Sequence, residues 1–151
     1  PMIETDFMTQ ALAEARAAEA RGEVPVGAVL VEAATGAVLA RAGNRVEELS
    51  DPTAHAEVLV IREATVARRD VRLPQCDLYV TLEPCALCAT AIAYARLRKV
   101  VFGAYDPKGG GVEHGPQIFD QPTIHHAPEV IGGVMETECA AILKVFFAQR
   151  R

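Results

Sequence analysis

Apolar residues along the chain follow two patterns, a helical spacing of three or four positions and short β-rich runs. In the first helical stretch Phe7, Ala11 and Leu12 share one face, with Thr5 or Asp6 as the candidate N-cap. The helical spacing predicts helices over residues 5–21, 52–68, 84–95 and from about 135 onward. The β-rich runs predict strands over residues 26–31, 38–42, 78–82 and 100–104, with a further short apolar run at 130 and 131.

The order of these elements constrains the sheet. The turn signal Thr35-Gly36 separates the first two strands, which predicts an antiparallel hairpin. The strand, helix and strand between residues 78 and 104 require a parallel pair with a right-handed crossover, and the preceding helix must cover the same sheet. An α/β sandwich follows, in which residues 105–128, rich in Gly, Pro and His without a clear period, form a long loop.

Composition indicates a single globular domain, taken as residues 2–151, because 50% of the residues are hydrophobic and 23% are charged. The formal net charge of -5 excludes a protein that coats nucleic acid by charge alone, although a local basic patch stays open. The sequence has no apolar run long enough to span a membrane and no secretory signal pattern. We therefore expect a cytoplasmic protein that does not interact with membranes.

Cysteine and histidine spacing carries the candidate chemistry. Cys85 and Cys88 form a Cys-x-x-Cys pair at the expected start of a helix, where both sulfurs can reach one ion, and His55 lies near the start of another helix. Two thiolates and one imidazole make three zinc ligands, which leaves a fourth position for water, as in catalytic zinc sites. Cys76 and Cys139 stand alone and are expected to be small buried residues.

Glu57 completes the pattern His-x-Glu followed by Pro-Cys-x-x-Cys, which is typical of zinc deaminases that act on nucleobases. A carboxylate close to zinc-activated water can accept its proton and pass it on. Two residues along a helix from His55, the Glu57 side chain should point about 200° round the axis, so we do not expect it to be a fourth ligand. Taken alone, the cysteine pair also fits a redox site, and a lone His and Glu carry no signal.

The three histidines of the 105–128 segment are a weaker candidate for a metal site. His114, His125 and His126 lack a regular ligand spacing, so loop packing or surface exposure is the favoured interpretation.

Beyond the motif, the chain resembles the bacterial tRNA-specific adenosine deaminases of the cytidine deaminase superfamily. The matching stretches are EVPVGAVLV at 23–31, DPTAHAEVLVIREA at 51–64, LYVTLEPCALCATAI at 78–92, VVFGAYDPKGG at 100–110 and ECAAILKVFF at 138–147. The resemblance implies a cytidine deaminase-like three-layer α/β/α sandwich with a central mixed five-stranded sheet, a homodimer and one Zn2+ per subunit. It also implies deamination of the wobble adenosine, A34, to inosine in a tRNA anticodon stem-loop.

Positions carried over from this family give roles to named residues. His55, Cys85 and Cys88 would bind zinc, and Glu57 would move protons. The backbone amide of Cys85, with Ala56, would help to hold water and base. The remaining substrate contacts implied by the resemblance are Asn44 at the base edge, Val26 and Leu82 as pocket walls, Pro84, and Asp106 and Lys108 near the RNA backbone.

Alternatives remain for several of these assignments. Asn44 also fits a turn residue after a strand. The same chemistry would serve a deaminase of a free nucleobase or nucleoside, such as guanine, cytosine or cytidine, and the acidic composition suits that reading. A non-catalytic subunit is a third possibility, which the intact Glu57 disfavours. Residues 112–129 match the family pattern poorly.

Overall fold

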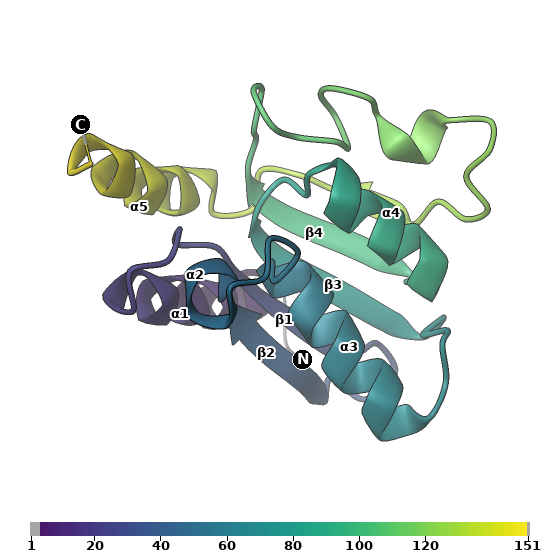
Figure 1. Ribbon diagram of the computed structural model, residues 1–151. Coiled ribbons are helices and arrows are strands. Elements are labelled where there is room, and N and C mark those ends of the chain that lie inside the picture. Colours follow the sequence, from purple (N-terminus) through teal and green to yellow (C-terminus); the bar gives the residue numbers. More distant parts are fainter. Residues whose placement is uncertain (1–3, 151) are drawn as a thin grey trace.

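A mixed five-stranded sheet lies between two layers of helices in the computed structural model, which describes residues 4–150 (Figure 1). The strands are β1 (Gly27–Glu32), β2 (Val38–Gly43), β3 (Cys76–Leu82), β4 (Lys99–Ala104) and β5 (Glu129–Ile131). The helices are α1 (Glu4–Ala20), α2 (Val46–Leu49), α3 (Ala56–Arg68), α4 (Ala86–Ala95) and α5 (Glu136–Ala148), with a 3-10 turn over Ile118–Asp120. The predicted three-layer α/β/α sandwich is confirmed.

Strand directions follow from the connections. The sheet order is β2-β1-β3-β4-β5, with β1 antiparallel to both β2 and β3, and with β3, β4 and β5 parallel. The expected hairpin is present, and its turn uses Gly36 at φ 75°, a conformation that glycine adopts without strain. Helix α4 makes the expected crossover between β3 and β4, and the apolar run at residues 130 and 131 becomes the edge strand β5.

Two apolar layers hold the helices on the sheet. On one face, α1 packs through Phe7, Met8 and Leu12 against the sheet, and Cys139 of α5 joins the same cluster. On the other face, α3 and α4 cover a core that includes Val60 and Ile92. Helix α1 comes so close that a Cβ at Gly27 would lie 2.0 Å from the Ala11 carbonyl oxygen, so only glycine fits there.

The largest difference from the prediction is the residue at which α3 and α4 begin, the two helices next to the candidate metal ligands. Helix α3 starts at Ala56 and not at residue 52, because the Asp51 carboxylate accepts hydrogen bonds from the Thr53 amide (2.8 Å) and hydroxyl (2.7 Å) and closes a separate turn. Helix α4 likewise starts at Ala86 and not at residue 84. His55 and Cys85 therefore occupy N-cap positions with extended backbone.

Cys76 and Cys139 are both buried, as expected. The four-residue helix α2 was not predicted, because one turn is too short to show a helical period. Within residues 4–150, no helix has the length and apolar character needed to cross a membrane.

Candidate active site

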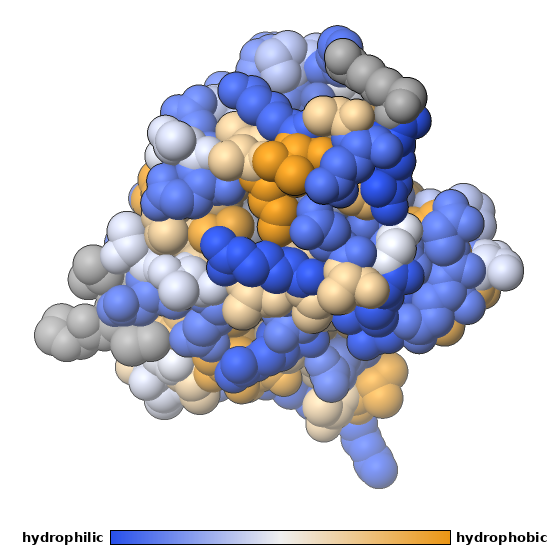
Figure 2. Space-filling model, turned by 90° about the vertical axis from the view of Figure 1, so that its left-hand side faces the viewer, coloured by the Kyte–Doolittle hydropathy of each residue, from blue (hydrophilic) through white to orange (hydrophobic). Residues whose placement is uncertain are grey.

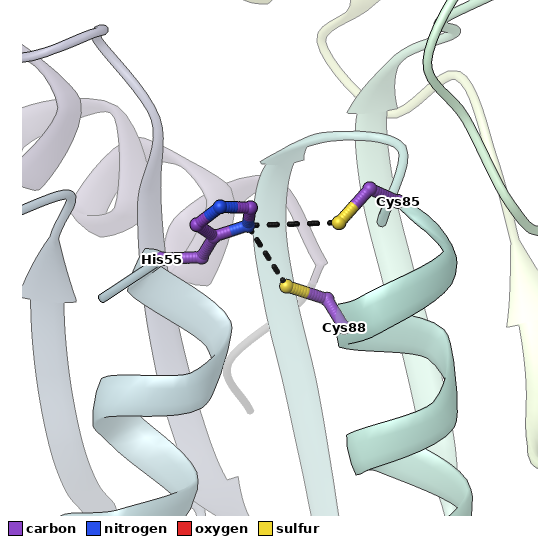
Figure 3. Close-up of side chains that lie close together, drawn as sticks. All are labelled: His55, Cys85 and Cys88. Carbon is purple, nitrogen blue, oxygen red and sulfur yellow. Dashed lines mark hydrogen bonds between the residues drawn. The ribbon is translucent and has the colours of Figure 1, made fainter. Parts of the chain in front are cut away.

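Two helix starts bring the predicted metal ligands together. His55 is the N-cap of α3, Cys85 is the N-cap of α4, and Cys88 lies in the first turn of α4. The three side chains point into the space between the two helix ends (Figure 3). His55 Nδ1 lies 3.5 Å from Cys85 Sγ and 3.4 Å from Cys88 Sγ. Within residues 4–150 these are the one group of three or more His, Cys, Asp or Glu whose ligand atoms all lie within 4.8 Å of one another.

These distances fit a zinc ion. Tetrahedral zinc with ordinary Zn–S and Zn–N bonds places its sulfur and nitrogen ligands about 3.6 Å apart, close to the separations measured between His55 and the two cysteines. Thiolate and imidazole are also typical zinc ligands, whereas calcium and magnesium bind mainly oxygen ligands. The Pro52 backbone hydrogen-bonds the His55 ring, which is the usual way that an outer group orients a ligating histidine.

Electrostatics in the group favour negatively charged sulfur. The hydrogen bond from Cys88, with a further one from His55, lowers the pKa of the Cys85 thiol to about 4. The same interaction with Cys85, together with burial, raises the pKa of the Cys88 thiol, and the hydrogen bond to Cys85 raises the pKa of His55. The site thus favours a thiolate at Cys85, and thiolate is the form of cysteine that coordinates zinc.

Glu57 lies at the same site, which corrects the expected opposite orientation. The angle of about 200° assumed that His55 belongs to the helix, but His55 precedes it with φ -73° and ψ 149°. The Glu57 carboxyl is buried and hydrogen-bonds Cys88. Burial raises the pKa of Glu57 to about 7. The structure therefore places a carboxyl group of near-neutral pKa beside the sulfur ligands.

Asn44 links the end of β2 to the start of α3. Its side-chain oxygen accepts a hydrogen bond from the Ala56 amide at 2.8 Å, which satisfies one of the free amides at the helix start. Ala56, which the resemblance placed beside water and base, thus has its amide engaged by Asn44. Asn44 also lines the cavity beside the metal ligands, so it is more than a turn residue. With its oxygen occupied, its NH2 group is the part available to a ligand.

One cavity of about 710 Å³ joins most of the predicted residues. Its lining includes His55, Cys85, Glu57, Asn44, Val26, Leu82 and Asp106. The view in Figure 2, from the side of the molecule where α5 ends, shows apolar side chains gathered near the middle of the face and framed by hydrophilic ones. A cavity of this size and mixed lining suits a drug-sized or nucleoside-sized ligand.

Other predicted contacts lie outside this lining. Pro84 is buried, and its carbonyl accepts a hydrogen bond from the Gly111 amide at 2.8 Å. Lys108 is exposed and lines a neighbouring hollow that it shares with Asp106. The loop histidines lie apart from the metal group: His114 contacts Glu83, and His126 contacts the Leu97 carbonyl.

Several lining residues were missed from the sequence. Phe146, Phe147 and Arg150 reach the cavity from α5 and the residues that follow it, far along the chain from the motif. Glu23 also lines the cavity, and its carboxylate accepts hydrogen bonds from the Glu47 and Glu48 amides at the start of α2. The spacing of these residues along the sequence does not indicate a shared site, because only the tertiary fold brings their segments together.

Comparison with known proteins places this geometry in a family. Residues 2–104 match the family model of the cytidine and deoxycytidylate deaminase zinc-binding region. The tRNA-specific adenosine deaminase of Agrobacterium fabrum is 58% identical over 147 residues, 97% of this chain and 95% of that protein. The Bacillus subtilis protein of the same name is 47% identical over 145 residues, 96% of this chain and 89% of that protein.

A solved structure from a study of A-to-I editing by tRNA:A34 deaminases at the wobble position superposes with a TM-score of 0.89. Its sequence is 59% identical, and the match covers 92% of this chain and 99% of that chain.

Replacing one sulfur ligand should remove the metal. We expect Cys88→Ser to lower bound zinc from about one ion per chain to about a tenth of that, because a hydroxyl is a poor substitute for a thiolate ligand. Elemental analysis by mass spectrometry measures the number of zinc ions bound per chain. The matched control is Cys76→Ala, a buried cysteine outside the group, which should keep its zinc. Full zinc occupancy in Cys88→Ser would contradict the assignment.

Proposed function

The chain belongs to the cytidine and deoxycytidylate deaminase family and to its tRNA-specific adenosine deaminases, and on this basis we propose that it converts the wobble adenosine, A34, of a tRNA anticodon stem-loop to inosine. The reaction consumes one water molecule and releases ammonia. One observation carries the proposal: the Glu57 carboxyl and the Asn44 amide line the same cavity as His55 and Cys85. The identity to relatives over nearly the whole chain supports the choice of substrate.

The metal site serves this hydrolysis. His55, Cys85 and Cys88 would hold one zinc ion per subunit, since their ligand atoms lie within 4.8 Å of one another, and three protein ligands are typical of a catalytic rather than a structural site. When bound, the ion supplies Lewis-acid activation of water near neutral pH.

Glu57 moves the protons. Its carboxylate takes one proton from the attacking water and delivers it to N1 of the adenine ring. It then takes the second proton from the new hydroxyl group on C6 and delivers it to the amino group, which leaves as ammonia as the C6–N bond breaks and the C6 carbonyl forms. Its burial beside Cys88 keeps bulk water away, and a pKa of about 7 suits a group that both accepts and releases protons at neutral pH.

The cavity walls bind and orient the base. Val26 and Leu82 provide apolar contacts, and the Asn44 NH2 group donates to an acceptor on the base edge. A base in a single-stranded loop can turn into such a pocket at little cost, because it has no Watson–Crick partner to leave.

Cationic and aromatic side chains beside the cavity suit the rest of the RNA. Arg150 lines the cavity, and Lys108 and Lys144 line the adjoining hollow. Phe147, 51% exposed, contributes to both and offers a surface on which a base can stack. These cationic groups can contact phosphate although the whole chain carries a net charge of -5.

We further propose that two copies associate through the outer surface of α3 and α4. A groove of about 440 Å³ lies there, lined by apolar residues that include Val58, Ile61 and Ala91. Leu87 and Tyr94 line the same groove with 42% and 68% of their surface exposed. An apolar surface of this kind is typical of protein interfaces.

The cytoplasm is the proposed location. The four cysteines are free, and a site that needs two thiolates is stable where the environment keeps them reduced.

Substrate choice can be tested directly with purified protein. An anticodon stem-loop with A34, the same RNA with G34, and free adenosine, guanine, cytosine and cytidine are incubated separately. Chromatography with mass spectrometry should detect inosine only in the A34 stem-loop. Deamination of small molecules alone would favour the free-base alternative, and RNA binding without any inosine would indicate a non-catalytic protein.

Replacing the proton carrier should separate chemistry from metal binding. We expect Glu57→Gln to keep zinc and to lower the deamination rate by about 10²–10⁴-fold, the usual contribution of a general acid–base group. Glu63→Gln, an exposed change on the same helix, is the control and should match wild type. A Glu57→Gln protein with wild-type turnover would remove Glu57 from the mechanism.

The proposed interface predicts the mass in solution. Sedimentation equilibrium of the wild-type protein should give twice the chain mass of 16.2 kDa. We expect Tyr94→Glu to shift the protein to the chain mass, because a buried unpaired carboxylate opposes association. Val145→Glu, at an exposed position on α5, should remain dimeric. Monomeric wild-type protein would refute the dimer, and a dimeric Tyr94→Glu would refute this surface.

A further inference from the structure

Glu83 is a buried carboxylate that binds backbone amides of the loop after β4. Its side chain is 0% exposed, and within residues 4–150 the one basic side chain within 4.0 Å of its oxygens is His114. Oxygen Oε2 accepts hydrogen bonds from the amides of Val112 (3.2 Å), Glu113 (2.9 Å) and His114 (3.1 Å). Oxygen Oε1 accepts one from the Asp106 amide (3.0 Å) and lies 2.8 Å from Nδ1 of the His114 ring.

The loop lies directly against the turn that carries Cys85. The Gly111 amide donates to the Pro84 carbonyl at 2.8 Å. A Cβ at Gly111 would lie 2.6 Å from the Ala86 amide nitrogen, so the loop backbone touches the start of α4. Val112 is buried in the core on this face of the sheet. The segment from residue 106 to residue 114 is therefore packed and hydrogen-bonded, although its sequence shows no regular period.

Hydrogen bonding stabilises the charge on Glu83. Four backbone amides and the His114 ring surround its two oxygens, and hydrogen bonds of this kind favour the charged form of a carboxyl group. A carboxylate surrounded by converging amides resembles the anion-binding arrangements that backbone turns form around phosphate. Glu83 thus acts as an internal anion that organises the loop around itself.

The segment held in this way forms part of the cavity. Asp106 and Gly109 line it, and the Asp106 carboxylate accepts hydrogen bonds from the Lys108 and Gly109 amides at 3.2 and 3.0 Å. Glu83 also lines the cavity, but both of its oxygens bind the loop. Glu83 therefore affects a bound ligand indirectly, by holding the loop that lines the cavity.

We propose that Glu83 is a positioning residue for the RNA substrate, holding residues 106–114 as a preformed wall of the cavity. The inference rests on the proposed function for the identity of the substrate. Loss of this anchor leaves the metal ligands and Glu57 in place but makes the wall mobile. Binding of the RNA must then order the wall, which weakens binding while leaving the chemical step intact.

The test compares Glu83→Gln with wild type in zinc content, amide hydrogen exchange and kinetics. Glutamine keeps the size but has one acceptor oxygen, so it cannot serve both sets of donors. We expect one zinc per chain and exchange about tenfold faster in peptides covering residues 106–114. For the A34 stem-loop, KM should rise about fivefold or more while kcat stays within about threefold.

Two further variants sharpen the result. Glu113→Gln makes the same chemical change at an exposed position of the loop and should behave as wild type. His114→Ala removes one contact to Glu83 and leaves the others, so it should give a smaller rise in exchange and KM. If Glu83→Gln does not fold, His114→Ala carries the test.

Three results would overturn the proposal: unchanged exchange in residues 106–114, a fall in kcat without a change in KM, or loss of zinc from Glu83→Gln. Absence of RNA deamination by the wild-type protein would instead refute the proposed function. The exchange comparison does not depend on substrate, so it still decides whether Glu83 anchors the loop.

Discussion

The chemistry of this protein depends on two helix N-termini, which must stay close enough for their side chains to bind the same metal ion. Neither helix can supply the three ligands alone, since His55 begins α3 and the two cysteines begin α4. Both helices pack on the same face of the sheet, through a core that includes Val60 and Ile92. Close packing in that core therefore sets the distance between imidazole and sulfur.

Buried acids shape the site in three different ways. Glu57 hydrogen-bonds its own backbone amide and Cys88, but burial outweighs these bonds, raises its pKa and suits it to proton transfer. Glu83 is surrounded by amides and serves as a fixed anion that orders a loop. Glu23 binds the amides at the start of α2 and holds another part of the cavity wall. The same functional group thus gives chemistry or structure according to the number of donors around it.

The sandwich and the metal ligands could be predicted from sequence because both depend on local patterns. Runs such as residues 78–82 and 100–104 reveal buried strands, and the motif residues are few and closely spaced. The orientation of Glu57 was predicted wrongly because the Asp51 turn delays the start of α3, so helical geometry does not apply to His55. The roles of Glu83 and Phe147 depend on contacts between distant segments, which no local period encodes.

X-ray absorption at the zinc edge of the purified wild-type protein identifies the atoms bound to the metal without relying on activity. We expect two sulfur neighbours at about 2.3 Å, from Cys85 and Cys88, and two lighter nitrogen or oxygen neighbours at about 2.0–2.1 Å. A shell of four sulfur atoms, a shell without sulfur, or a protein that binds no zinc would contradict this expectation.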